Sequence, residues 1–329
     1  MIVMTGGTRG LGRVAAQQIE LGGTKIMGAR DGAEVPVGWS SRPLDLASLE
    51  SVRRFVESLP DEPVTHLILN AGVQFPTADK RTAEGIEVTF ATNHLAHHLL
   101  LRLLMPRLSP GARVVITSSG THDPRERTGV PAPRHAIAEL LAHPECDPTR
   151  DPPRVGGMRA YSSSKLCNLM TARYLAASEA ACAGGWSVFA YDPGLTPGTG
   201  LVRGQPWLVR NLVWPLLPIL APFFAGMNDV KAAGRGLAEL TTSARAPAGQ
   251  VYAALRRGRL TWPTPSEMAM DDAAAAALWR DSAVLTCRSL AAVTLKAMGH
   301  SAPGTTPAAQ DELACRELVT EDQARPDLT

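Results

Sequence analysis

Apolar runs the length of β-strands alternate with helical patterns along most of the chain. Predicted strands are a run that ends at Thr5, a short segment that ends near residue 44, and residues 24–28, 65–70, 113–119, 186–191 and 250–252. Apolar positions at helical spacing predict helices at residues 14–21, 47–59, 82–104, 134–142, 161–182, 229–241 and 271–292. This alternation favours an α/β fold, with one Rossmann-type, doubly wound parallel sheet of about seven strands and helices on both faces.

Two stretches interrupt this alternation, at about residues 120–158 and 201–227, and we expect both to lie over the functional site. The second has an apolar centre and contains Pro215, Pro218 and Pro222. Its prolines disfavour a membrane-spanning helix, which needs about 20 largely apolar residues. We interpret it as a lid that builds an apolar wall for a substrate; a buried helix pair, a dimer face and shallow membrane contact are the alternatives.

The chain shows no internal repeat and no linker that would divide it. Residues 1–300 are therefore predicted to form a single domain. Residues 301–329 are polar and rich in proline, which predicts a disordered tail.

Composition and charge exclude several classes of function. The chain has 329 residues, 45% of them hydrophobic, and a formal net charge of +2, so no nucleic-acid footprint is indicated. Its 5 cysteines are widely spaced and include no Cys-x-x-Cys pair, which disfavours a disulfide framework and a zinc site. The first residues leave no room for a charged leader and an apolar signal core, so we expect a cytoplasmic protein.

A glycine-rich turn with the spacing Gly-x-x-x-Gly-x-Gly follows the first strand and precedes the first helix. Gly6, Gly10 and Gly12 would allow a tight turn, the approach of a pyrophosphate to the helix N-terminus, and close packing of helix on strand. A nucleotide site is the favoured interpretation, and a simple tight connection is the alternative.

Two arginines suggest which nucleotide would bind. Arg30 follows the second strand, where a residue that reads the adenosine ribose is expected, and Arg9 lies in the glycine turn. Together they would form a cationic clamp for a 2′-phosphate and favour NADP(H) over NAD(H), although each alone could be a surface charge. Asp45 and the adjacent Leu46 are expected on the adenine side, with Asp45 accepting from the adenine amino group or capping the next helix.

The segment that contains Tyr161 and Lys165 offers acid–base chemistry. Four residues apart on a helix, the phenol and the ammonium would share one face, and a nearby cation would lower the pKa of the phenol. A solvated surface pair is the alternative for this spacing alone. Ser118 and Ser119 end the strand at residues 113–119, at the sheet edge where α/β proteins place their sites.

The long helix at residues 82–104 carries Asn93 at its centre, where an asparagine competes for backbone hydrogen bonds and invites a kink. His94, His97 and His98 crowd beside it. With no second cluster of ligands elsewhere, we interpret them as helix-face histidines rather than a metal site.

Six motifs in order resemble those of the short-chain dehydrogenase/reductase superfamily. They are Thr5 to Gly12, Asn70-Ala71-Gly72, Asn93, Ser119, Tyr161 with Lys165, and Pro193-Gly194. Within it, the chain is most similar to the light-dependent protochlorophyllide reductase and retinol-dehydrogenase-like branch. The features shared with that branch are Thr92 to Leu95 with His98, Tyr161 to Asn168, and Thr199-Gly200-Leu201 after Pro193-Gly194. Family members usually carry threonine where Gly198 stands, so that part of the cofactor grip departs from the pattern.

The resemblance implies a role for each motif residue. Tyr161 would donate the proton in reduction or act as the base in oxidation, Lys165 would lower its pKa and bind the nicotinamide ribose, Ser119 would polarise the carbonyl oxygen, and Asn93 would anchor a water. The implied cofactor contacts are Gly6, Thr8, Arg9, Gly10 and Leu11 at the pyrophosphate, Asn70, Ala71 and Gly72 under the adenine ribose, and Pro193, Gly194 and Thr196 at the nicotinamide.

The implied activity is NADP(H)-dependent interconversion of a ketone or aldehyde with an alcohol on a bulky, apolar small molecule. One alternative is reduction of a conjugated carbon–carbon double bond, as in protochlorophyllide reductase, where a cysteine at the position of Cys167 has been given a role. Another is a non-catalytic, NADP-sensing binding protein. Family members occur as monomers, dimers and tetramers, so a homo-oligomer is possible.

Overall fold

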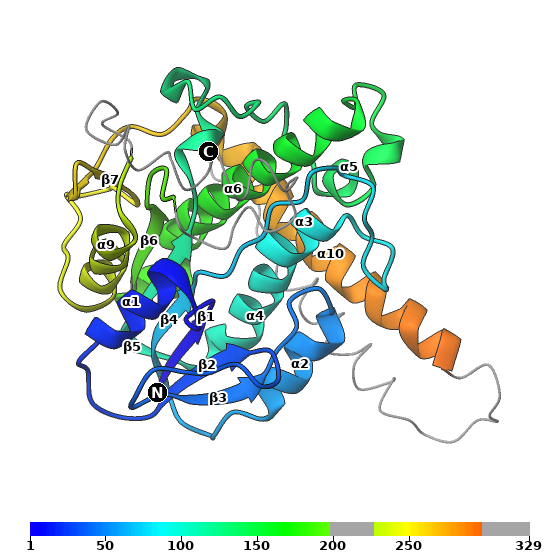
Figure 1. The fold of residues 1–329 in the computed structure, drawn as a ribbon. Coiled ribbons are helices and arrows are strands. Elements are labelled where there is room, and N and C mark those ends of the chain that lie inside the picture. Colours follow the sequence, from blue (N-terminus) through cyan, green and yellow to red (C-terminus); the bar gives the residue numbers. More distant parts are fainter. Residues whose placement is uncertain (198–226, 298–329) are drawn as a thin grey trace.

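A single eight-stranded sheet runs through the computed structural model, which describes residues 1–197 and 227–297, with side chains as far as residue 287. The strand order is β3-β2-β1-β4-β5-β6-β7-β8 (Figure 1). The strands are β1 (Ile2–Thr5), β2 (Lys25–Ala29), β3 (Ser40–Pro43), β4 (Val64–Leu69), β5 (Leu108–Thr117), β6 (Ser187–Asp192), β7 (Tyr252–Arg256) and β8 (Arg259–Thr261). Only β7 and β8 pair antiparallel, so the predicted parallel α/β sheet is confirmed with one strand more than expected.

Helices cover both faces of the sheet (Figure 1). They are α1 (Gly10–Gln18), α2 (Leu49–Glu57), α3 (Val88–Phe90), α4 (Ala96–Leu104), α5 (Ala138–Ala142), α6 (Pro153–Ala177), α7 (Glu179–Gly184), α9 (Val230–Thr242) and α10 (Asp272–Ala297). Alternate strand residues point to opposite faces. Ile2 and Met4 pack with α1 and α9, whereas Val3 packs in the core formed with α2, α4, α6 and α10. Both faces are therefore buried, which explains why the strands read as continuous apolar runs.

The C-terminal helix α10 packs against α6, α5, α2 and α4. Trp279 of α10 lies edge-on to the ring of His98, with ring centroids 4.7 Å apart, and stacks on Tyr174 of α6 at 5.0 Å. Ser282 of α10 is hydrogen-bonded to His94, at 3.0 Å. This helix thus completes the core on the α4–α6 side of the sheet.

The helix predicted at residues 82–104 is shorter and irregular. Gly85, with φ +81°, and a bridge between Arg81 and Glu87 keep residues 82–87 out of the helix, which begins at Val88. Glu87 caps it by accepting from the backbone N–H groups of Thr89 and Phe90, at 2.9 and 2.7 Å. The irregularity expected near Asn93 is confirmed, because Ala91–Leu95 forms a π-helical turn.

Three further boundaries differ from the prediction. Helix α6 begins at Pro153, not at Tyr161, and ends before Ser178, whose hydroxyl caps the separate helix α7. Strand β8 was not predicted, since it is short and follows a tight turn at Arg257 and Gly258, with φ +50° and +71°. Ser48, not Asp45, caps α2 by accepting from the N–H of Ser51.

The first insertion, residues 120–158, contains the 3-10 turns Gly120–His122, Pro124–Glu126 and Pro144–Cys146, helix α5 and the start of α6. Most of the second insertion, and the predicted tail at residues 301–329, fall outside the described residues, so both interpretations stay predictions.

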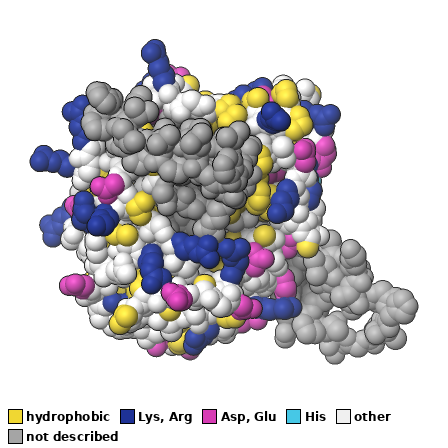
Figure 2. Space-filling view, in the orientation of Figure 1, with side chains coloured by type: hydrophobic (Ala, Val, Ile, Leu, Met, Phe, Trp, Pro, Cys, Tyr) yellow, Lys and Arg dark blue, Asp and Glu magenta, His cyan; other side chains and the backbone are white. Residues whose placement is uncertain are grey.

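None of the helices in the described ranges combines the length and apolarity that crossing a bilayer requires. Basic and acidic side chains both occur across the face shown in Figure 2, in line with the formal net charge of +2.

Candidate active site

The carboxyl ends of four neighbouring strands bring the predicted motifs to one edge of the sheet. The strand register pairs Thr5 with Leu69, Leu69 with Ile116, and Thr117 with Tyr191. The residues that follow these positions are the glycine turn, Asn70-Ala71-Gly72, Ser118-Ser119 and Asp192-Pro193-Gly194. Segments that lie up to 189 positions apart therefore meet where open α/β sheets place their ligands.

The glycine turn and the segment from Asn70 to Gly72 are bound to each other. The hydroxyl of Thr5 accepts from the N–H groups of Asn70 and Ala71, at 3.0 and 3.2 Å, and the Asn70 amide donates to Gly6 O at 3.0 Å. A Cβ on Gly6, where φ is +69°, would lie 2.6 Å from the Ala71 backbone. Only glycine allows this approach, so the two predicted cofactor segments form one surface.

Helix α1 begins at Gly10, and the side chain of the preceding N-cap residue, Arg9, makes no capping hydrogen bond. The free N–H groups and the positive end of the helix dipole suit an anion there. Arg30 follows β2, and the pairing of Thr5 with Gly28 brings it to the strand end beside the glycine turn. Both guanidinium groups are exposed, and within the described part of the chain neither has a hydrogen bond or an ion pair.

The two residues predicted at the adenine side differ in exposure. Asp45 is exposed, and one of its carboxylate oxygens accepts from the N–H of Ala47 at 3.0 Å. Leu46 is only 9% exposed and packs in the core, so its side chain does not face a ligand. The predicted contact of Leu46 is thus limited to its backbone.

Tyr161, Ser119 and Lys165 come together at this edge. The Tyr161 phenol is buried, and the Ser119 side chain lies near enough to lower its pKa. One helical turn along α6, the Lys165 ammonium lies 5.7 Å from the centroid of the Tyr161 ring and donates to Thr117 O at 3.0 Å. A Cβ on Gly72 would lie 3.4 Å from this ammonium, so Lys165 also borders the nucleotide-binding segments.

The choice of Ser119 over Ser118 agrees with the geometry. The Ser118 hydroxyl is buried and donates to the carbonyl of Lys165 at 2.8 Å, which fixes β5 to α6. Ser119 is only partly buried, its hydroxyl accepts from the N–H of Thr121 at 3.3 Å, and it influences the pKa of Tyr161. Ser119 is therefore the one of the pair that a ligand could reach.

Asn93 has a positioning role in the structure. Its amide donates to Val73 O and to the Ser164 hydroxyl, at 2.9 and 3.0 Å, and its carbonyl accepts from the N–H of Val73 at 2.8 Å. These bonds fasten the segment after Gly72 to helix α6. The water predicted at Asn93 stays a prediction.

Burial dominates the titration of the acid–base pair. It raises the pKa of Tyr161 well above the ordinary value; the nearby Ser119 side chain lowers this pKa, and the charge of Asp192 raises it. Burial also lowers the pKa of Lys165 to about 8, against a raising effect of Asp192. The prediction that Lys165 would bring the phenol toward neutrality is thus wrong for the protein alone, because desolvation of the phenolate outweighs the cation.

The segment after β6 turns tightly. Gly194 has φ +70°, and its N–H donates to the Asp192 carboxylate at 2.9 Å. The Thr196 hydroxyl donates to Gly194 O at 3.1 Å, and the Asn228 amide donates to Pro193 O at 3.0 Å. These bonds hold the backbone of the predicted nicotinamide segment, whose continuation at Gly198 lies outside the described residues.

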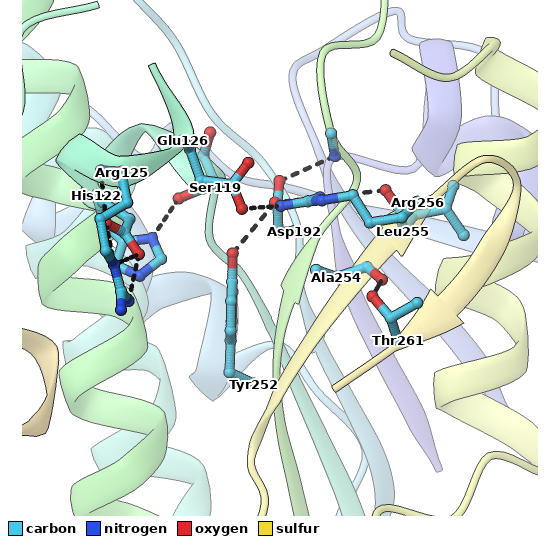
Figure 3. Close-up of polar contacts among 12 residues, drawn as sticks. Ser119, His122, Arg125, Glu126, Asp192, Tyr252, Ala254, Leu255, Arg256 and Thr261 are labelled. Atoms are coloured by element: carbon cyan, nitrogen blue, oxygen red, sulfur yellow. Dashed lines mark hydrogen bonds and ion pairs between the residues drawn. The ribbon is translucent and has the colours of Figure 1, made fainter. Parts of the chain in front are cut away.

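A charged network that the sequence patterns do not predict lies beside Ser119 (Figure 3). The Asp192 carboxylate accepts from Tyr252 Oη at 3.1 Å and from Arg256 Nη1 at 2.8 Å, and Arg256 Nη2 donates to Glu126 at 2.7 Å. The position of Asp192 directly before Pro193-Gly194 was the available signal. Nothing local links it to Arg256, which lies 64 residues further along the chain.

The three crowded histidines lie inside the core, not on an open helix face. His97 Nε2 is 2.9 Å from the Thr5 hydroxyl, and His94 lies between Asn168 and Ser282. Burial lowers the pKa of His94 to about 4, that of His97 to about 3 and that of His98 well below 6.5. Among the described residues, no group of three His, Cys, Asp or Glu side chains could hold a metal ion.

Comparison with known proteins places these features among reductases. The chain is 30% identical over 313 residues to a chloroplastic protochlorophyllide reductase from Daucus carota, which covers 85% of this chain and 76% of that protein. Among solved structures, an uncharacterised protein from Mycobacterium paratuberculosis is 29% identical with a TM-score of 0.61, over 87% of this chain and 92% of that one. A short chain dehydrogenase from Burkholderia cenocepacia in complex with NADP shares the fold, with 19% identity and a TM-score of 0.54 over 77% and 94%. No protein-family model matches the chain.

Proposed function

Because the chain belongs to the short-chain dehydrogenase/reductase superfamily, we propose that it is an NADP(H)-dependent oxidoreductase that interconverts a carbonyl group and an alcohol. The observation that carries the proposal is the convergence of three groups at the carboxyl edge of the sheet: the buried Tyr161 phenol, the Ser119 side chain, which influences its pKa, and the Lys165 ammonium, 5.7 Å from the centroid of the Tyr161 ring. These are the groups that acid-assisted hydride transfer to a carbonyl requires: two hydroxyls for the oxygen and a cation beside them.

The residues at the sheet edge fit a dinucleotide. The backbone at Gly6, Thr8, Gly10 and Leu11 would hold the pyrophosphate at the uncapped start of α1, and Arg9 with Arg30 would bind a 2′-phosphate. Asp45 and the Leu46 backbone would border the adenine, Asn70, Ala71 and Gly72 the ribose, and Lys165, Pro193, Gly194 and Thr196 the nicotinamide end. The two exposed guanidinium groups, neither of them paired within the described residues, favour NADP(H) over NAD(H).

In reduction, the chain's own residues would manage the oxygen of the substrate. NADP(H), when bound, supplies the hydride. Ser119 would donate a hydrogen bond to the carbonyl oxygen, and Tyr161, which keeps its proton at neutral pH because burial raises its pKa, would transfer that proton to the oxygen as its negative charge develops. Lys165 would stabilise the phenolate that remains.

Turnover with NADPH and a panel of ketones and aldehydes tests the proposal. Tyr161→Phe removes the transferable proton and leaves the helix intact, so we expect the rate to fall by up to about 10⁴-fold while NADPH still binds. Consumption of NADPH at the wild-type rate by the variant would contradict the mechanism. Binding of NADPH by the wild type without turnover on any carbonyl would favour the NADP-sensing alternative.

A second candidate reaction has one observation in its favour. The relatives that are 30% identical to this chain include protochlorophyllide reductases, which suggests reduction of a conjugated carbon–carbon double bond. Cys167 gives no support, because it is fully buried and burial raises the pKa of its thiol. Offered an α,β-unsaturated ketone, a carbonyl reductase would yield the allylic alcohol, and a double-bond reductase the saturated ketone.

The preference for a bulky, apolar substrate rests on the composition of residues 201–227, most of which lie outside the described part. A cytoplasmic location and a homo-oligomer likewise stay predictions.

A further inference from the structure

Asp192 occupies a junction between the catalytic groups and the Gly194 turn. It ends β6 directly after Tyr191, which pairs with Thr117, and the Thr117 carbonyl accepts from the Lys165 ammonium. Its carboxylate is 1% exposed. A buried carboxylate therefore lies at the strand end next to the one that binds Lys165.

Both oxygens of the Asp192 carboxylate accept hydrogen bonds. One oxygen accepts from the N–H of Gly194, and the other accepts from Tyr252 and Arg256 (Figure 3). The second oxygen also lies 3.1 Å from where a Cβ on Gly120 would stand, so it abuts the segment that begins at Ser119. These contacts fix the carboxylate in place, between the Ser119 segment and the Gly194 turn.

Arg256 distributes its charge between two carboxylates. Beyond Asp192 it binds Glu126, whose side chain is 35% exposed, at the outer end of the network. The titratable groups that face Asp192 are Tyr161 and Lys165 on α6, His122 and Glu126 after β5, Tyr252 and Arg256 on β7, and its chain neighbour Tyr191. The charge of Asp192 raises the pKa of both Tyr161 and Lys165.

We propose that Asp192 is a positioning residue whose buried carboxylate, held by Arg256 and Tyr252, keeps Lys165 protonated beside Tyr161 and fixes the Gly194 turn against the Ser119 segment. The negative charge acts through space, because the Lys165 ammonium donates its hydrogen bond to Thr117. Burial alone would leave this lysine neutral over part of the working pH range, since it lowers the pKa to about 8 even with Asp192 present. Asp192 thus supports the cation on which the acid–base pair depends.

The inference rests on the proposed function, but it can be tested without turnover. Lysines labelled with ¹³C at Cε are titrated by NMR in the protein alone, and the Lys165 resonance is assigned by its absence from Lys165→Met. In Asp192→Asn, which keeps the size and loses the charge, we expect the Lys165 midpoint to fall by about one pH unit. Glu126→Gln is the matched control: it removes the same charge from the other side of Arg256 and should leave the midpoint unchanged.

A second variant covers the case in which Asp192→Asn does not fold. Arg256→Gln removes the positive charge that partly cancels the charge of Asp192. The Lys165 midpoint should therefore move upward, opposite to the shift in Asp192→Asn. An unchanged midpoint in a folded Asp192→Asn, or an equal fall in Glu126→Gln, would overturn the proposal.

The kinetic readout separates this inference from the proposed function. The alkaline limb of kcat/KM should move to lower pH in Asp192→Asn, while the KM for NADPH changes less than kcat. A wild-type protein that never turns over would refute the proposed function and leave the NMR result standing. If turnover is measurable but the alkaline limb of kcat/KM stays at the same pH in Asp192→Asn, the role of Asp192 is refuted.

Discussion

Acid should destabilise this protein through its buried histidines, and His94 gives the clearest test. Burial lowers its pKa to about 4 in the folded protein, against 6.5 when it is exposed in the unfolded chain. Between these values the unfolded state binds more protons, so the free energy of unfolding falls as the pH drops. The stability that the neutral histidine contributes is present above about pH 6.5 and is lost progressively toward pH 4.

The magnitude follows from the two pKa values. From pH 7 to pH 5, the linkage relation gives a loss of about 2 kcal/mol for His94, and a similar loss for His97, whose folded pKa is about 3. Glu87 acts in the opposite direction, because burial raises its pKa to about 7 from 4.5, and protonation of the folded state offsets about one histidine over this range.

Comparing a His94 variant with the wild type cancels the contributions of the other titrating groups to the free energy of unfolding. His94→Gln can still bond to Asn168 and Ser282 but does not titrate. Urea unfolding, followed by tryptophan fluorescence at pH 7 and pH 5, should show that the variant loses about 2 kcal/mol less than the wild type on acidification, whatever its stability at pH 7. An equal loss in both proteins would refute the assignment of a buried, neutral His94.

Two further changes test the cofactor surface. Replacing Arg9 and Arg30 together with alanine should weaken NADPH by at least about tenfold more than NADH in a binding titration, since only NADPH offers a 2′-phosphate to the charge-assisted bonds; equal weakening of both cofactors would make the arginines structural. Gly6→Ala brings a Cβ to 2.6 Å from the Ala71 backbone at φ +69°, so the free energy of unfolding should fall by more than about 1 kcal/mol and NADPH affinity should drop. Gly22→Ala, where a Cβ meets nothing within 4 Å, is the control and should stay within about 0.5 kcal/mol of the wild type; matching behaviour of the two variants would contradict the close approach.

Local patterns were sufficient for the elements that carry the site. Strands buried on both faces are apolar throughout, and motif residues follow their ends, so Gly6, Asn70 and Ser119 could be assigned to one edge from the sequence alone. Strand β8 could not, because its pairing depends on a two-residue turn with Arg257 in a left-handed conformation.

Long-range contacts and burial explain what the sequence did not predict at the site. The Asp192 network joins residues 126, 192 and 256, and no spacing rule connects them. The sign of the Tyr161 pKa shift depends on how deeply the phenol is buried, which the four-residue spacing to Lys165 does not reveal. Leu46, next to Asp45, is predicted to border the adenine, but its side chain packs in the core.

Because α10 packs on α6 and α4, this part of the core can be completed only late in synthesis on the ribosome. His94 and its partner Ser282 are separated by 188 residues, which at about 5–20 residues per second means roughly 10–40 s of synthesis between them. Once α6 has been synthesised, the face that it forms with α4 stays without Trp279, which covers His98 and Tyr174, until α10 is made. The nascent chain thus presents an uncovered, partly apolar face while most of its sheet is already made, and chaperones that bind such surfaces would have their best opportunity before α10 emerges.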